Sequence, residues 1–324
     1  MNSEVFAEWF RRQGLKVIKT ASSWWVELGM RTYQAFPYQW IIQPDESELD
    51  DLLIKNRALA LRYSTHSSAG EGMHSYHAVF QGDSYGLDRL GKWARKNVRR
   101  GLSKCSVERI SLAELARTGW SLQEDTLNRQ SRNPSFSSEN WQKMCCAAGD
   151  LPGFTAWGAF TKEHGKLAAS VITFQMDDWV YMLYQQCCSD MLALHANNAL
   201  AFEVTTRVLE GTSTKSILYG LHSLDAPPSV DEFKFRMGYY PKPVKQRVKF
   251  NRLIAPGVNS YSYWGLKKLA SLVETNATLS KAEGMCRFFL QGKAPTEKKG
   301  ASILKQHDGA SASARYTTAL PREE

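Results

Sequence analysis

The stretch from Gly165 to Phe250 constrains the fold most, because strand-like and helix-like patterns alternate along it. Two β-prone runs, 165–175 and 179–186, flank an acidic turn and are typical of a hairpin. Helix-like and strand-like segments then alternate at about 197–209, 216–220, 230–238 and 244–250. The order strand, strand, helix, strand, helix, strand predicts a mixed α/β sheet layered with helices.

The element Phe233-Lys234-Phe235-Arg236-Met237-Gly238 stands just before the last strand of this stretch. With the order of elements around it, it resembles the GNAT acyltransferase superfamily, and more closely its FemAB and BioF2-like branch. In that branch an aromatic-rich hairpin strand is followed by a helix, and a Phe-Lys-x-x-x-Gly-like element precedes the last strand. The resemblance covers 165–250 and implies a GNAT-like mixed sheet flanked by helices, compatible with two GNAT-like halves.

The domain organisation follows from this reading and from composition. With 324 residues, of which 43% are hydrophobic, the chain is long enough for two modest domains or one large one. The pattern thins after Phe250, and a Lys, Ser, Ala, Gly and Glu-rich segment without periodicity begins at Gly292. We therefore expect an N-terminal half (1–104), a C-terminal catalytic half (105–252), a helical extension (253–291) and a disordered tail (292–324).

The net charge and the cysteines limit which partners and which cellular compartment we expect. No run of eighteen apolar residues and no signal-peptide pattern is present, so the expected location is the cytoplasm. The formal charge of +9 favours anionic partners, although a solvated basic tail explains part of it equally well. The six cysteines lack the spacing of a zinc site, so we expect reduced thiols and no metal.

A basic helix is predicted from about Leu87 to Leu102, with Arg95, Arg99 and Arg100 among its cations. Such a helix binds phosphates, tRNA or lipid head groups, or simply forms a solvated face. In FemAB-like proteins a similar basic helix leads from the first domain to the second. The resemblance therefore places a binding role for these arginines level with a solvated face.

Three other motifs invite a functional reading. The sequence Gly82-Asp83-Ser84-Tyr85-Gly86 matches the nucleophile elbow of serine hydrolases, or else it is a tight turn before a helix. His74 and His77 lie on a predicted strand, where residues three apart face opposite sides and cannot share a metal. A dense aromatic group is interpreted as core rather than as a substrate groove: Trp24, Trp25, Tyr33, Phe36, Tyr38 and Trp40.

The resemblance assigns a donor site to the strand 179–186 and the loop 189–198. In GNAT proteins an acyl-CoA lies between two splayed strands, and its pyrophosphate sits on the N-terminus of the next helix. This loop contains no glycine and no arginine, so acetyl-CoA competes with aminoacyl-tRNA or an acyl carrier protein as the donor. The residues expected to bind the carrier are Gln185, Gln186, Asn197 and Asn198.

The resemblance also assigns catalytic roles. Lys234 matches a lysine that steadies the acyl carbonyl in FemAB-like sites, and His195 is the candidate base at the start of a helix. Tyr181 and Tyr184, three apart, are expected on opposite sides of their strand, with Tyr184 as the proton donor. The expected substrate-binding residues are Arg236, Tyr219, Asp225 and Arg99.

These features together predict an N-acyltransferase that moves an acetyl, other acyl or aminoacyl group to an amine. The amine would attack the carrier ester or thioester directly. The resemblance implies a small-molecule or sugar-nucleotide acceptor, or a cell-envelope precursor. The alternative is a non-catalytic GNAT-fold module that binds RNA or an anionic membrane through its basic face. Peripheral membrane contact fits both hypotheses, and a serine hydrolase that uses Ser84 is a third.

Overall fold

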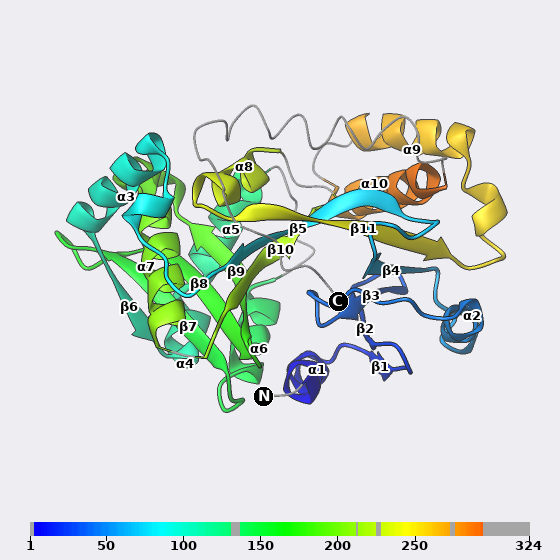
Figure 1. Ribbon diagram of the computed structural model, residues 1–324, viewed down its shortest axis with the longest axis horizontal. Coiled ribbons are helices and arrows are strands. Elements are labelled where there is room, and N and C mark those ends of the chain that lie inside the picture. Colours follow the sequence, from blue (N-terminus) through cyan, green and yellow to red (C-terminus); the bar gives the residue numbers. More distant parts are fainter. Residues whose placement is uncertain (1–2, 131–136, 212, 225–227, 273–275, 294–324) are drawn as a thin grey trace, which may run out of the picture.

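The computed structural model describes residues 3–130, 137–211, 213–224, 228–272 and 276–293, and one mixed sheet runs through it (Figure 1). The eleven strands of this sheet lie in the order β1-β2-β3-β4-β11-β5-β10-β9-β8-β7-β6. Helices cover both faces, which confirms the mixed α/β class predicted from the sequence. The sequence predicts a disordered tail from 292, but Gly292 is the last residue of a helix, and the rest of the tail from 294 onward lies outside the described residues.

The bounds of the elements follow the sequence patterns closely. The strands are β1 (Val17–Lys19), β2 (Trp24–Glu27), β3 (Thr32–Phe36), β4 (Ala60–Thr65), β5 (Met73–Gln81), β6 (Cys105–Ile110), β7 (Phe154–Thr161), β8 (Leu167–Met176), β9 (Trp179–Cys187), β10 (Ser216–Leu221) and β11 (Tyr240–Phe250). The α-helices are α1 (Ser3–Arg12), α2 (Glu46–Lys55), α3 (Lys92–Lys104), α4 (Leu112–Thr118), α5 (Trp120–Arg129), α6 (Ser138–Ala147), α7 (Ala196–Glu210), α8 (Pro228–Arg236), α9 (Ser260–Leu272) and α10 (Ala277–Gly292). Three short 3₁₀-helices complete the set: η1 (Leu87–Arg89), η2 (Ser189–Leu194) and η3 (Ala255–Gly257).

Two parallel contacts organise the sheet, one on each side of its central strands β11 and β5. Strand β3 pairs in parallel with β4, and β9 pairs in parallel with β10, whereas the other neighbouring strands are antiparallel. The chain also exchanges strands between its halves. Strand β5 pairs with β10 from the second half, and β11 lies between β4 and β5. The two long strands β5 and β11 therefore form a central ribbon that both halves share, and the boundary at residue 104 stays a prediction.

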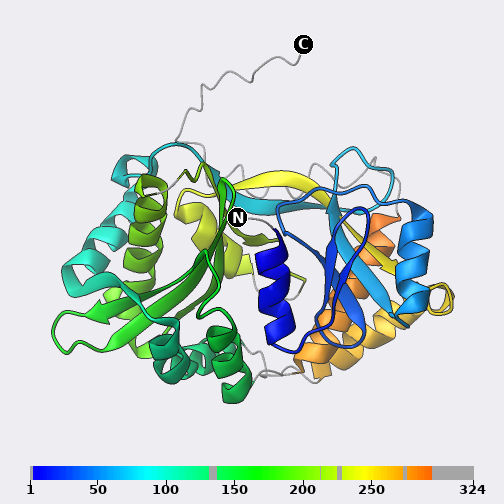
Figure 2. The same cartoon turned by 90° about the horizontal axis from the view of Figure 1, so that it is seen from below.

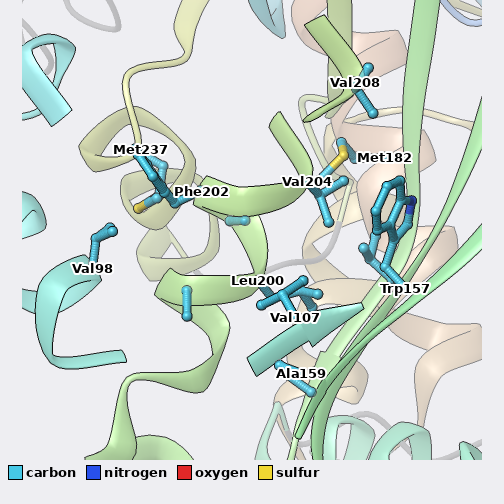
Figure 3. Packing of buried hydrophobic residues seen from close by; sticks show 14 of the residues in the cluster. Val98, Val107, Trp157, Ala159, Met182, Leu200, Phe202, Val204, Val208 and Met237 are labelled. Carbon is cyan, nitrogen blue, oxygen red and sulfur yellow. The ribbon is translucent and has the colours of Figure 1, made fainter. Parts of the chain in front are cut away.

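Helix α7 is the centre of the larger apolar core. It lies between the sheet and α3, and Figure 3 shows Val98 of α3, Phe202 of α7 and Met237 converging there. A Cβ added at Gly101 would lie 2.5 Å from the His195 backbone oxygen, so glycine is what lets α3 approach the start of α7.

The opposite face of the same strands is covered by α1, α4 and α6. Phe6 of α1 is buried against Phe174 and Tyr181, and the Trp9 indole donates to the Met144 carbonyl oxygen at 3.0 Å. The N-terminal helix thus lies against strands of the second half, and Figure 2 shows it near the middle of the molecule. Burial of such aromatic side chains supplies much of the hydrophobic free energy of folding.

The aromatic group predicted as core is buried at Trp24, Trp25, Tyr33 and Phe36, whereas Trp40 is 39% exposed and Tyr38 is half-buried, so the prediction is wrong for these two. The start of the predicted basic helix also differs from the structure. The basic helix begins at Lys92 rather than Leu87, because 87–89 form the 3₁₀-helix η1 and Gly91 precedes α3 in an extended conformation. The apolar run at 285–290 belongs to the longer helix α10, which buries Met285, Phe288 and Phe289.

Candidate active site

Strands β9 and β10 separate soon after they meet. Their parallel pairing covers Trp179–Tyr181 on β9 and Ser216–Leu218 on β10, after which no pairing between them is formed in the described residues. Strand β9 continues along β8 to Cys187, while β10 continues along β5 to Leu221. The sheet is therefore open between the far ends of β9 and β10.

A β-bulge at Tyr184 enlarges this opening. Opposite β8, the register jumps from Ile172–Leu183 to Ser170–Gln186, and Tyr184 has a left-handed φ of 47°. The bulge also corrects the expectation that Tyr181 and Tyr184 face opposite sides. Tyr181 packs on Phe6 and Tyr184 lies 6.3 Å from the Trp9 ring, so both face α1. The extra residue in the bulge breaks the simple alternation on which the prediction rested.

A cavity of about 300 Å³ lies on this side of the opening. Its lining comes from both halves of the chain: Leu28, Gln34, Tyr38, Arg62, Tyr181, Met182, Leu183, Tyr184, Leu218, Gly220 and Leu221. Burial raises the pKa of Tyr184 to about 12, and that of Tyr38 is raised by burial and by Tyr184. Both hydroxyls are therefore protonated at neutral pH and can donate hydrogen bonds to a ligand.

Lys234 lies in a buried ion pair beside the opening. Its Nζ donates to Asp231 Oδ1 at 2.6 Å within α8, and the Tyr76 hydroxyl of β5 donates to Asp231 Oδ2 at 2.6 Å. The Lys234 and Asp231 side chains are each only 9% exposed. Burial and the Asp231 carboxylate raise the pKa of Tyr76 well above its ordinary value, so this hydroxyl remains a donor.

Gly220 lies next to this ammonium and also lines the cavity. Gly220 lines the cavity and has a φ of 157°, and a Cβ there would lie 3.5 Å from the Lys234 Nζ. The Nζ is also 5.6 Å from the Tyr219 ring centroid, within the range of a cation–π contact. The cation is thus held next to a residue of the cavity wall that has no side chain.

A chain of hydrogen bonds continues from Tyr219 across the opening. The Tyr219 hydroxyl donates to Gln185 Oε1, and Gln185 Nε2 donates to Asn197 Oδ1 at 2.6 Å in the first turn of α7. The Tyr219 ring meets Tyr239 edge to face, and burial raises the Tyr219 pKa well above its ordinary value. We call Asp231, Lys234, Tyr219, Gln185 and Asn197 the polar relay.

A histidine that the sequence reading missed adjoins this relay. His222 follows β10, stacks on Tyr76 at 4.7 Å, and lies with its Nδ1 3.2 Å from Ser75 Oγ. Burial lowers its pKa to about 4, against an opposing contribution from Asp231, so the ring is neutral at pH 7. Helix α10 fixes the segment that follows, because Arg287 donates to the Leu224 carbonyl oxygen at 2.6 Å.

The loop after β9 is held from outside by α5. The Ser189 N–H donates to Asp125 Oδ2 at 2.6 Å, and Arg129 Nη1 donates to the Cys187 carbonyl oxygen at 3.0 Å. The loop forms the 3₁₀-helix η2 and ends at His195, whose φ of 56° is left-handed. Burial, and then Arg100, lower the His195 pKa.

The remaining predicted site residues lie elsewhere. Gln186 is buried toward α5, where it donates to Gln123 and accepts from Ser170, and Asn198 contacts Met237 Sδ at 3.5 Å. Arg236 pairs with Glu232 at the solvent surface, and Arg99 is exposed on α3. Asp225 lies outside the described residues.

Other motifs do not assemble a site of their own. The Gly-x-Ser-x-Gly segment is not a nucleophile elbow, because α3 begins only at Lys92 and a sharp strand-to-helix turn at Ser84 is missing. His77 is buried with its Nε2 2.8 Å from Ser64 Oγ. Within the described ranges, no group of three or more His, Cys, Asp or Glu is arranged to hold a metal ion. No helix in the described chain is long and apolar enough to cross a membrane.

Sequence reasoning missed Tyr76, Asp231, His222 and Arg62. The spacing of Asp231 and Lys234 on one helix was a usable signal, since residues three apart are neighbours on a helix surface. Tyr76 carried no such signal. It reaches the relay only because β5 crosses to pair with a strand of the second half.

Comparison with known proteins supports the fold. No protein-family model matches the sequence, and neither does any curated protein. Among solved structures, FemX matches with a TM-score of 0.51 at 11% identity, over 74% of this chain and 90% of FemX. The C-terminal DUF2156 domain of a proposed lysylphosphatidylglycerol synthetase from Agrobacterium fabrum matches with a TM-score of 0.50 at 13% identity, over 78% of this chain and 90% of that one. These likenesses show that the chain has a fold like that of FemX and of the DUF2156 domain.

Proposed function

We propose that the protein is an acyltransferase that transfers an acyl or aminoacyl group to an amine at the opening between β9 and β10. The observation that carries the proposal is the buried Lys234 ammonium beside Gly220, a residue of the cavity wall. Positive charge held at a fixed point in a site of low dielectric stabilises a developing oxyanion. The likeness to FemX and to the proposed synthetase domain supports this proposal at the level of the fold.

The reaction would be a direct displacement. The amine nitrogen attacks the acyl carbonyl carbon and forms the C–N bond, while the carbonyl electron pair moves to oxygen. Lys234 Nζ stabilises that oxyanion. Collapse of the tetrahedral intermediate breaks the C–S bond of a thioester or the C–O bond of an ester. The leaving sulfur or oxygen ends with the proton that the amine loses.

We assign different roles in proton transfer to the tyrosines and to His195. Tyr184 and Tyr219 are protonated at neutral pH, so neither is suited to act as a base. The Tyr219 hydroxyl donates to Gln185 Oε1, so Tyr184 is the proposed donor to the leaving group. His195 has a lowered pKa and is neutral at pH 7, so it is the candidate base for an acceptor that reaches the start of α7. The acceptor we propose is the amine of a sugar nucleotide or of a cell-envelope precursor.

The start of α7 bears on the donor. Its Asn198 N–H donates to the His195 carbonyl oxygen at 3.0 Å, and the Asn197 N–H faces the Cys187 thiol. Fewer backbone N–H groups at the start of α7 are therefore free to bind a pyrophosphate. This arrangement supports aminoacyl-tRNA or an acyl carrier protein over acyl-CoA as the donor.

A donor panel tests both parts of the proposal. The protein is incubated with mixed amines and, in turn, with acyl-CoAs, acylated carrier protein or aminoacyl-tRNA, and amide products are detected by mass spectrometry. We expect transfer from one donor class, and a rise in thermal stability with that donor, worth about 2.7 kcal/mol at a hundred times its dissociation constant. Absence of transfer and of stabilisation with every donor would overturn the proposal.

Lysine variants make the test specific. Lys234→Met should abolish transfer, whereas Lys55→Met, at a lysine of α2 that is 72% exposed and paired with Asp51, should leave it unchanged. Transfer that survives Lys234→Met in a folded protein would remove Lys234 from the mechanism.

A second candidate function is RNA binding through α3. Arg99, Arg100 and Lys96 are exposed, and none of them forms an ion pair within the described residues. Arg95 is partly buried instead, because its Nη2 donates to the Leu90 carbonyl oxygen at 3.0 Å. Neutralising Arg99 and Arg100 should lower the slope of log affinity against log salt for single-stranded RNA by about 0.7 per charge. An unchanged slope would exclude this face.

A further inference from the structure

Helix α9 has two apolar faces, and only one of them is packed. Tyr263, Leu266 and Ala270 form the inner face at helical spacing, and the Tyr263 hydroxyl donates to Glu283 of α10 at 2.8 Å. The helix has no fully buried residue. Figure 1 shows α9 and α10 together on one side of the ribbon formed by β5 and β11.

The outer face of α9 carries large exposed side chains. Tyr261 is 88% exposed, Trp264 65% and Leu272 74%, and together with Lys268 they follow the spacing i, i+3, i+7, i+11 of one helix stripe. We call Tyr261, Trp264, Lys268 and Leu272 the outer stripe. An aromatic and leucine stripe left in water loses the free energy that burial would supply. It therefore indicates an occupant.

The charges of this segment indicate what the occupant is. Residues 251–272 contain Arg252, Lys267 and Lys268 and no aspartate or glutamate. Lys268 lies within the stripe, with its Nζ 5.3 Å from the Trp264 ring centroid. In a dry protein interface that ammonium would be desolvated, whereas at a membrane surface a lysine extends to the head groups while its stem stays apolar. Tyrosine and tryptophan are also the side chains enriched at the membrane–water boundary.

We propose that α9 docks the protein on an anionic lipid bilayer through the outer stripe. The helix lies in the plane of the surface. Tyr261, Trp264 and Leu272 enter the boundary between head groups and acyl chains, and Lys267 and Lys268 contact anionic head groups. This surface is separate from the polar relay, so the proposal does not depend on the acyltransferase assignment.

Vesicle flotation of the full chain tests the proposal. The protein is mixed with vesicles of phosphatidylcholine alone, or with vesicles that also contain phosphatidylglycerol. We expect flotation with the phosphatidylglycerol vesicles. The double variant Trp264→Ala/Leu272→Ala should lower partitioning at least about tenfold because it removes buried apolar area. Lys267→Gln/Lys268→Gln should lower it about thirtyfold because two charges no longer reach the anionic surface.

Trp93 provides a matched control. It is 74% exposed on the basic helix α3, and Lys96 lies over its ring at 5.6 Å, much as Lys268 lies over Trp264. Trp93→Ala should float like the unmodified protein. Equal flotation of the Trp264→Ala/Leu272→Ala variant, or loss of flotation with Trp93→Ala alone, would overturn the assignment to α9.

Two further outcomes identify a different occupant and would also overturn the proposal. If the full chain does not float but a chain ending at Lys293 does, residues 294–324 cover the stripe. If the protein does not float and sedimentation shows a dimer that Trp264→Ala/Leu272→Ala dissociates, the occupant is a second copy of the chain.

Discussion

The two parallel strand contacts of the sheet have the same plan and different surroundings. Strand β3 pairs with β4 through Thr32–Gln34 and Ala60–Arg62, and β9 pairs with β10 through Trp179–Tyr181 and Ser216–Leu218. Strand β3 ends at Phe36, next to a cis Phe36–Pro37 bond, and α2 follows. Around it, an apolar cluster fills the space: Trp25, Tyr33, Ala35, Ile42, Leu49, Leu52, Leu53, Ala58, Leu61 and Tyr63.

The second contact is opened and polar. Strand β9 runs on to Cys187 through the bulge at Tyr184, and the polar relay crosses the gap to α7. Apolar side chains fill one face of the first contact, while Gln34 and Arg62 at its end line the cavity that the second contact also adjoins. The second contact differs by its buried cation and by the polar relay. The comparison indicates that the strand plan sets the shape of each half and that the side chains around it decide where a polar site can form.

The largest expected difference between the two halves is in the cost of breaking an ion pair. Asp231→Ala leaves the Lys234 ammonium buried without its carboxylate, which should lower the free energy of unfolding by about 3–5 kcal/mol. Asp51→Ala in the first half breaks a pair with Lys55 that is 64% and 72% exposed, and should cost less than about 1 kcal/mol. Urea unfolding of both variants measures the difference. Equal costs would mean that the relay is not held by a buried pair.

The stability of the protein in acid should depend on His77, a buried residue whose contact with Ser64 lies outside the polar relay. Burial, and then Lys242 and Arg62, lower the pKa of His77 to about 3. Above pH 6.5 the ring is neutral in both states. Below pH 6.5 the His77 ring is protonated in the unfolded chain, whereas in the native chain it stays neutral down to about pH 3. The free energy of unfolding therefore falls as the pH falls. The loss should be about 1.4 kcal/mol per pH unit, or about 3 kcal/mol between pH 6 and pH 4.

The His77→Gln variant isolates this contribution. Its unfolding free energy should fall less steeply between pH 6 and pH 4 than that of the unmodified protein, because the carboxylates contribute equally to both. Acyl transfer at pH 7 should be unchanged, since His77 contacts Ser64 rather than the relay. Parallel pH profiles for the two proteins would contradict the assignment of a neutral buried ring.

Backbone geometry gives the next contrast. Gly220→Val should cost about 1–3 kcal/mol because a φ of 157° is strained for a branched residue. The same substitution should abolish transfer, because its side chain would enter the space beside Lys234 Nζ. Gly29→Val in the first half has comparable strain at a φ of 91° but meets no atom within 4 Å. It should therefore lose stability and keep transfer activity. Loss of transfer in both variants would show that strain alone explains the effect.

The sequence predicted the elements better than the site. Periodicity placed α7 and the β8–β9 hairpin within a residue or two, because local patterns of burial define both. It could not place β5 or β11 in the sheet, since strand exchange depends on contacts between residues far apart in the chain. Tyr184 shows the same limit on a smaller scale. One inserted residue turned it toward α1, and the alternation rule carries no information about a bulge.

The candidate site was predicted in part for the same reason. Lys234 and Gln185 come from segments with the strongest family resemblance, and the structure places them in one relay with Tyr219 and Asn197. Tyr76 lies on β5, which the sequence assigned to the other half. Gln186 was expected beside Gln185, but neighbouring residues on a strand face opposite sides, and Gln186 is buried toward α5.

The smallest expected effect is the most specific test of the relay. Tyr219→Phe removes the hydroxyl that donates to Gln185 and keeps the ring near Lys234 and Tyr239. It should cost about 1 kcal/mol of stability. In the first half, Tyr33→Phe removes a hydroxyl that donates to Glu27 Oε2 at 3.2 Å, and should cost no more than that.

Only Tyr219→Phe should slow acyl transfer, because only its hydroxyl connects the Lys234 side of the opening to α7. Comparison of the transfer rates of the two folded variants with that of the unmodified protein measures this. Equal rates in all three would leave Lys234 as a possible oxyanion contact but would remove Tyr219, Gln185 and Asn197 from the reaction. The opened contact would then differ from the packed one by a single cation.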